Sequence, residues 1–188
     1  MGLREMTKDR RQNIIEAGIA TLRGYGYVGF TQPRVAASAG LRQSHLTYYY
    51  PTRVDLLVAV GRAAIEGQLA AMDAVLEGSS SKALASAIAK LVARHENTRV
   101  LMALAQAADQ EPQLKALFRE LADGIVTRAG RVLKTLNSAA TEVDARLLHA
   151  LAVGLAVVDL ATSRADGKRR AAAVLETALR LLSKTAGP

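Results

Sequence analysis

The stretch TQPRVAASAGLRQSHLTYYYPTRVDLL, residues 31–57, determines the fold that we expect for the amino-terminal part of the chain. Thr31 can cap a short helix that tolerates Pro33 in its first turn and stops at Gly40. A second short helix is expected from about Arg42 to Tyr49. Two short helices joined by a tight glycine turn are typical of a helix-turn-helix, whose second helix enters the major groove of DNA.

A longer helix is predicted on each side of this pair. Before it, apolar residues recur at helical spacing from Ile15 to Leu22, and the glycine-rich RGYGYVG ends that helix. After it, Thr52 and Asp55 approximate a capping box, and apolar residues continue at helical spacing to Leu76. The first 50 residues are therefore predicted to be three helices that lead into a long fourth.

Aromatic and basic side chains are concentrated in the same region. Six of the seven aromatic residues lie in the first 50 positions, and no acidic residue occurs between Glu16 and Asp55. That interval holds four arginines, in a chain whose formal net charge is +8: Arg23, Arg34, Arg42 and Arg53. An acid-free basic segment is typical of a surface that binds a polyanion. Charge alone still favours an ordinary solvated surface, so the arrangement of the helices has to distinguish it from a polyanion-binding surface.

The three consecutive tyrosines cannot all face one core. Successive residues of a helix point about 100° apart, so at least one of Tyr48, Tyr49 and Tyr50 must face outward, toward solvent or a phosphate. We expect Tyr50 to belong to the small core that sets the angle between the helices, with five other residues: Val35, Ala36, Ala39, Leu41 and Leu46.

These residues carry a resemblance. IIEAGIATLRGYGYVGFTQPRVAASAGLRQSHLTYYYPTRVDLL resembles the DNA-binding segment of the tetracycline-repressor (TetR) family of bacterial transcription regulators. The matching points are the GY that closes the first helix, Thr31, VAASAGL across the turn, and LTYYYPTRVDLL. The match covers about the first 60 residues without a gap. It implies a ligand-responsive repressor that binds a palindromic operator in double-stranded DNA as a homodimer.

The resemblance also implies roles for single residues. Gln43, Ser44 and Thr47 would reach base edges from the recognition helix, where a glutamine can pair with adenine. Two further groups would contact the backbone or flanking bases, namely Thr31 and Arg34 before the turn, and Tyr48, Tyr49 and Arg53 after it. Arg53 replaces the family's usual lysine. Arg42 replaces its usual Ser or Thr helix cap, and we expect it to contact DNA.

The rest of the chain is predicted to be helical as well. Amphipathic segments are expected at 82–94, 97–109, 112–137, 142–164 and 168–185. The predicted fold is therefore all-α, with a helix-turn-helix domain at 1–50 and an effector-binding and dimerisation domain at 51–188.

The helix at 142–164 is apolar on nearly all sides, so it has to be covered on all sides. A two-fold four-helix interface with the last helix of a second copy would do this, and the family dimerises in this way. The residues predicted for this interface are Leu147, Leu151, Gly154, Leu155, Val158, Leu175, Leu179 and Leu182. The alternative is a central helix that is simply buried within one chain.

The family holds a small effector between its central helices. Candidates for lining that pocket are Met72, His95, Met102, Gln106 and His149, each of which is also an ordinary core or surface residue type. Because Phe118 is the one aromatic residue beyond position 50, we expect an aliphatic or acyl effector rather than a flat ring.

Other classes of protein find little support. The chain has no cysteine, and its three histidines are far apart, so we predict no metal, no cofactor and no catalytic site. The amino terminus lacks the apolar stretch of a signal peptide, and the longest apolar segment, 147–161, is shorter than the ~20 residues that span a bilayer. We expect a cytoplasmic protein. The alternative function is a DNA-binding or architectural protein without sequence preference or effector.

Overall fold

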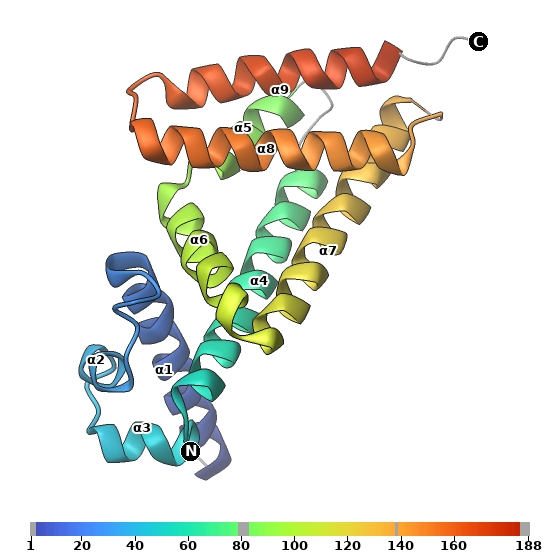
Figure 1. Cartoon of the computed structure of the whole chain (residues 1–188). Helices are drawn as coiled ribbons and strands as arrows, with labels where there is room; N and C mark the ends of the chain where they lie inside the picture. Colours follow the sequence, from blue (N-terminus) through green and yellow to red (C-terminus); the bar gives the residue numbers. More distant parts are fainter. Residues whose placement is uncertain (1–2, 79–82, 138, 185–188) are drawn as a thin grey trace. The chain divides into compact units, whose positions relative to one another are not determined.

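The computed structural model describes residues 3–78, 83–137 and 139–184, and all of their regular structure is helical (Figure 1). The all-α prediction is confirmed. The predicted helix ends differ from the observed ends by a residue or two, and two of the predicted ends, 82 and 185, lie outside the described residues. The helices are α1 (Leu3–Tyr25), α2 (Gln32–Ser38), α3 (Gln43–Tyr49), α4 (Arg53–Gly78), α5 (Leu84–Val92), α6 (His95–Gln110), α7 (Pro112–Leu136), α8 (Glu142–Thr162) and α9 (Gly167–Lys184).

The chain packs as two compact units. The first unit joins residues 1–67 to 99–118, and the second joins 68–98 to 119–188. Helices α4, α6 and α7 therefore each contribute one part to either unit. This grouping differs from the predicted boundary after residue 50, because residues 99–110 of α6 and the start of α7 pack with the amino-terminal helices. The predicted division between DNA binding and effector binding stays a prediction.

The first unit is built around a core of side chains from α1, the turn after it, α2, α3 and α4. Those without exposed surface include Ile14, Leu22, Phe30, Val35, Leu46, Leu56 and Leu57. Gly61 lets α4 approach the segment 99–118, since an added Cβ would lie 3.2 Å from Leu114 and 3.3 Å from Leu104. That segment is therefore part of the same core.

The local signals predicted between residues 31 and 55 are present in the structure. The Thr31 side chain accepts a hydrogen bond from the Arg34 amide at the start of α2, and Gly40 has a positive φ of 67° in the turn after it. Thr52 and Asp55 form the reciprocal bonds of a capping box at the head of α4, with N–O distances of 3.1 and 3.0 Å. Local side-chain chemistry thus positions α3 between two defined turns.

In the second unit, α8 and α9 lie side by side, and α5 packs against both (Figure 1). The core of this unit includes Leu133 of α7, Ala145 of α8 and Leu175 of α9. A paired Arg128–Asp73 contact joins α7 to the end of α4, with Nε–Oδ1 and Nη2–Oδ2 distances of 2.7 and 2.6 Å. These hydrogen bonds from Arg128 lower the pKa of Asp73 and keep its carboxylate charged.

Candidate nucleic-acid interface

Helix α3 is held by one buried side chain and presents most of the others to solvent. Leu46 is buried, whereas Arg42, Gln43, Ser44 and Tyr48 are exposed, and Tyr48 retains 82% of its accessible surface. We call these four exposed residues, together with the half-buried Thr47, the α3 surface. A short helix that is anchored at a single point and polar elsewhere can place its side chains in a groove of DNA.

The tyrosine triplet divides as the helical geometry predicts. The rings of Tyr48 and Tyr49 meet edge to face with their centres 5.2 Å apart, and the guanidinium of Arg11 lies 5.9 Å from the centre of the Tyr49 ring. Tyr50 is half-buried, and burial raises the pKa of its hydroxyl, an effect that Arg11 partly offsets. The expectation that the three rings do not share one core is confirmed.

Arg42 occupies the cap position of α3 and makes no capping bond. Its backbone is extended, its side chain is exposed, and no hydrogen bond runs from it to the first turn. A serine or threonine here would satisfy an amide of that turn. The guanidinium of Arg42 instead adds a positive charge to the α3 surface.

Arg34 and Arg53 are engaged with the protein itself. The Arg34 guanidinium lies 4.4 Å from the ring centre of Tyr25 and donates from Nη1 to the Gly29 carbonyl at 2.7 Å. The half-buried Arg53 donates from Nε to the Phe30 carbonyl at 2.8 Å, and from Nη2 to the Tyr27 carbonyl at 3.0 Å. Its remaining contacts involve the Tyr27 side chain. The predicted contacts of Arg34 with phosphate or flanking bases, and of Arg53 with phosphate, stay predictions. In this structure both guanidinium groups bind the turn between α1 and α2.

The exposed apolar side chains of α8 agree only in part with the predicted dimer residues. Leu147, with 57% of its surface exposed, and Val158 are open to solvent, Gly154 has open space beside it, and Leu151 and Leu155 are half-buried. Successive spacings of four, three and four residues place Leu147, Leu151, Gly154 and Val158 along one side of the helix. A fifth apolar residue, Val143, is exposed on that side as well.

The dimer residues predicted on α9 lie on a different side of the helix from its exposed apolar residues. Leu175, Leu179 and Leu182 are buried in the core of their own unit, because that side of α9 faces α5 and α8. The exposed apolar residues of α9 are Val174 and Leu181, seven positions apart and so on one side of the helix. We call Val143, Leu147, Val158, Val174 and Leu181 the α8–α9 apolar row.

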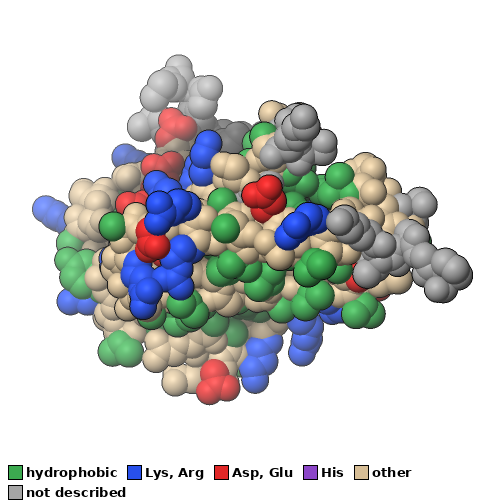
Figure 2. All heavy atoms as spheres, turned by 90° about the horizontal axis from the view of Figure 1, so that it is seen from above, with side chains coloured by type: hydrophobic (Ala, Val, Ile, Leu, Met, Phe, Trp, Pro, Cys, Tyr) green, Lys and Arg blue, Asp and Glu red, His purple; other side chains and the backbone are tan. Residues whose placement is uncertain are grey.

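Figure 2 looks onto α8 and α9 from above and shows apolar side chains gathered along the middle of this surface. Basic side chains gather at one end of it in the same view. The turn between α8 and α9 and the first residues of α9 carry four exposed basic side chains: Arg164, Lys168, Arg169 and Arg170. The surface is thus apolar along its length and positively charged at one end.

The five predicted effector residues are not brought into one described cavity. Met102 and Gln106 are exposed in the first unit, and Met72, His95 and His149 are half-buried in the second. The Nε2 atom of His95 lies 2.8 Å from a carboxylate oxygen of Asp159 on α8. Burial lowers the pKa of His149, and the nearby Arg146 lowers it further.

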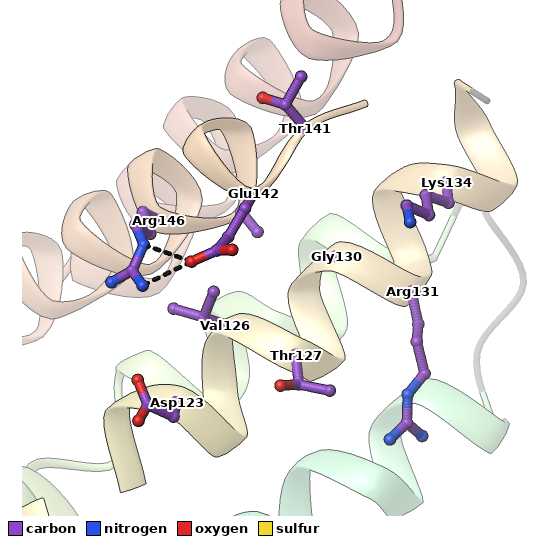
Figure 3. Close-up of a pocket in the computed structure, with 10 residues that line it drawn as sticks. Asp123, Val126, Thr127, Gly130, Arg131, Lys134, Thr141, Glu142 and Arg146 are labelled. Carbon is purple, nitrogen blue, oxygen red and sulfur yellow. Dashed lines mark hydrogen bonds and ion pairs between the residues drawn. The ribbon is translucent and has the colours of Figure 1, made fainter. Parts of the chain in front are cut away.

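A cavity of about 590 Å³ lies elsewhere, between α7 and the start of α8 (Figure 3). Its lining combines charged and hydroxyl side chains with apolar ones, and Glu142 and Arg146 form an ion pair along its α8 side. Arg131 points from α7 away from α8 in this view. None of the five predicted effector residues lines this cavity or the smaller hollow beside the α8–α9 turn.

The described residues include no group of three or more His, Cys, Asp or Glu side chains placed to hold a metal ion. Helix α8 is, among them, the one helix long and apolar enough to cross a membrane by length and composition, and one such helix is weak evidence for a membrane span. It extends beyond the apolar segment 147–161 through its polar ends.

The chain is similar to known proteins over most of its length. Residues 79–183 match the family described as "Tetracyclin repressor-like, C-terminal domain". A transcriptional regulator from Rhodococcus sp. RHA1 shares the fold with a TM-score of 0.81 at 20% identity, over 92% of this chain and 95% of the other. A TetR-family member from Streptomyces coelicolor A3 has a TM-score of 0.68 at 26% identity, over 90% and 97%.

A third similar structure is that of the multidrug binding protein EbrR in complex with proflavin. Its TM-score is 0.63 at 27% identity, with 90% of this chain and 99% of that chain covered. No curated protein matches the sequence.

Proposed function

Since the chain belongs to the tetracycline-repressor (TetR) family of transcription regulators, we propose that it is a ligand-responsive repressor that binds a palindromic operator as a homodimer. The observation that carries this proposal is the α3 surface, a helix-turn-helix recognition helix whose polar residues are exposed. A cytoplasmic location follows from this function.

Base readout is assigned to α3. Gln43 and Ser44 are exposed at its start and Thr47 lies one turn later, so a helix in the major groove would bring all three toward base edges. The Thr47 hydroxyl donates to the Ser44 carbonyl at 3.1 Å and keeps its lone pairs as acceptors for a base amino group.

Backbone contacts are assigned to the side chains around α3. Arg42 and Tyr48 are exposed, Thr31 caps α2, and Tyr49 is the last residue of α3, so these side chains can position α3 on the phosphates. Arg34 and Arg53 are assigned an indirect role in DNA binding. They act by holding the turn that precedes α2, and any phosphate contact would use the guanidinium N–H groups that this turn does not occupy.

Dimerisation is assigned to the α8–α9 apolar row. Burying such side chains is favourable by about 25 cal/mol per Å² of apolar surface. In an isologous interface the row of one copy packs against the same row of the other. A second copy of this chain is therefore sufficient to cover it. A dimer with two α3 helices then reads a palindrome.

The effector of this proposal is a small aliphatic molecule. Phe118 is the one aromatic residue beyond position 50, so few rings are available in the predicted effector-binding region to stack on a flat ligand. EbrR was solved with proflavin, a flat aromatic compound, and offers a direct comparison. A titration in which aromatic ligands bind this chain better than aliphatic ones would contradict the proposed class of effector.

The function is tested by incubating the purified protein with fragments of its native genome, recovering the bound fragments and sequencing them. Enrichment of a short palindrome supports a dimeric, sequence-specific regulator, and the neighbouring genes nominate effectors to test for release. Uniform recovery of fragments would favour the alternative of a DNA-binding protein without sequence preference.

A further inference from the structure

The side chain of Tyr27 joins three parts of the first unit that are distant in sequence. Tyr27 lies in the turn between α1 and α2 and exposes only 6% of its surface. Its hydroxyl donates to Oε1 of Gln110, the last residue of α6, at 3.1 Å. The segment 99–118 packs with residues 1–67 in one compact unit, so this hydrogen bond lies inside that unit.

The same hydroxyl is the acceptor for Arg53 at the head of α4. Nη1 of Arg53 lies 3.3 Å from the Tyr27 hydroxyl oxygen, and the guanidinium stacks on the Tyr27 ring at 4.4 Å. Donors and acceptors are therefore ordered along a chain, with the guanidinium donating to the hydroxyl and the hydroxyl donating to the amide oxygen of Gln110. Each bond polarises the next, and their energies are coupled.

This series of hydrogen bonds ends at the backbone of the turn that precedes α2. Arg53 also binds the carbonyls of Tyr27 and Phe30, and Thr31, the cap of α2, follows directly. Arg34 binds the carbonyl of Gly29 between them. Three carbonyls in this turn are thus bound by guanidinium groups, and the orientation of α2 and α3 depends on the turn.

We propose that Gln110 is a positioning residue for DNA binding, which acts through the Tyr27 hydroxyl on Arg53 and on the turn that starts α2. This inference rests on the proposed function. It assigns the carboxyl end of α6 to the DNA-binding machinery, although this segment lies 60 residues beyond the predicted DNA-binding domain, which ends at residue 50. Displacement of the end of α6 would release the hydroxyl and loosen the hold on Arg53.

The experiment compares Gln110→Ala, Tyr27→Phe and the double variant with wild type, by anisotropy on the selected palindrome and by thermal unfolding. Gln110 is exposed, and Tyr27→Phe removes one oxygen atom while keeping the stacked ring, so each variant is expected to fold. Gln113→Ala is the matched control, since Gln113 is an exposed glutamine in the first turn of α7.

Each single variant should weaken operator binding by about two- to tenfold, the range expected for one lost hydrogen bond. The double variant should bind about as well as Tyr27→Phe alone, because Tyr27→Phe already lacks the hydrogen bond to Gln110 as well as the one from Arg53. Gln110→Glu retains an acceptor and should bind more tightly than Gln110→Ala, once compared with Gln113→Glu to account for the added charge. Gln113→Ala should bind as wild type does.

Two results would overturn the inference. One is unchanged affinity in both single variants alongside a lowered melting temperature, which would make the bond a structural tether only. The other is additive losses in the double variant, which would mean that the two residues act separately.

If no palindrome is selected and the wild-type protein binds no DNA, the proposed function fails and this inference is tested by amide exchange. The amides of residues 27–35 should then exchange faster in Gln110→Ala than in Gln113→Ala. Equal exchange rates in the two variants would overturn the positioning role.

Discussion

The α3 surface and the α8–α9 apolar row are both exposed, but only the side chains of the α3 surface can form hydrogen bonds with water. The α3 surface consists of hydroxyl, amide, guanidinium and phenol groups, which hydrogen-bond to water when no partner is present. The apolar row exposes aliphatic side chains, which form no hydrogen bonds with water: Val143, Leu147, Val158, Val174 and Leu181. The first surface suits a partner that binds and leaves, and the second suits a permanent partner.

The largest effect is expected from placing a charge in the apolar row. Leu147→Glu should convert the dimer to a monomer, because two carboxylates would be buried across the interface. Loss of the second half-site contact should weaken operator binding by about 100-fold or more. Light scattering after gel filtration measures the mass, and anisotropy measures the affinity.

Ala173→Glu is the control for this change. Ala173 is exposed on α9, about 100° around the helix from Val174. The Ala173→Glu variant should remain dimeric, with unchanged affinity for the operator. A dimer of Leu147→Glu with unchanged affinity would show that the row is not the interface.

The next largest effect is expected on α3. Gln43→Ala should change which base is preferred at one position of each half-site, with a loss of about 1–3 kcal/mol for the original base. Arg42→Ala serves as the contrast, since loss of a phosphate contact should weaken all sequences alike and reduce the salt slope by about one unit. Binding measured over a panel of single-base operator variants separates the two outcomes. An unchanged preference in Gln43→Ala would mean that α3 is placed differently in the groove.

A smaller effect on stability is expected from removing the helix caps, one near the α3 surface and one at the start of α8. Thr31 caps α2 and Thr141 caps α8, and Thr141 forms a complete capping box with Asp144. Thr31→Ala and Thr141→Ala should each lower the free energy of unfolding by about 1 kcal/mol. Thr31→Ala alone should also weaken operator binding. Denaturant unfolding and anisotropy on the same samples test this, and equal binding losses would contradict the separation of the two surfaces.

The smallest effect is expected from His149 on α8. Its folded pKa lies below the ordinary value of 6.5, because burial and then Arg146 disfavour the charged form. As pH falls through 6.5, the unfolded chain binds a proton that the folded chain does not, so stability decreases toward acid. His149→Gln should flatten the dependence of the free energy of unfolding on pH between about 7 and 5.5. The same slope in both proteins would assign the pH dependence to other groups.

The helices and their ends were predictable because the interactions that set them are local. Thr31, Gly40, Thr52 and Asp55 act on backbone groups within four residues of themselves, and the structure shows each in its expected role. The exposure of Tyr48 followed from the rotation of a helix, which requires no knowledge of the rest of the fold.

The partners of long side chains were not predictable in the same way. Arg53 was expected to meet a phosphate, and in the structure its guanidinium binds carbonyls more than twenty residues away. Gln110 was missed altogether, since nothing near it in the sequence distinguishes it from any surface glutamine. The tyrosines of the glycine-rich turn could have suggested internal cation–π contacts, and two such contacts, Arg34 on Tyr25 and Arg53 on Tyr27, are present in the structure.

The sequence by itself determined the helix-turn-helix, the capped helix starts and the apolar character of α8, because each depends on residues within a turn or two. Only the tertiary structure decided which apolar side of α9 is buried. Leu175, Leu179 and Leu182 on one side and Val174 and Leu181 on another are equally apolar in the sequence. The position of α5 and α8 against α9 assigns the first group to the chain's own core and leaves the second exposed. Apolar burial has no preferred direction, so a pattern of leucines cannot distinguish an internal neighbour from a second copy.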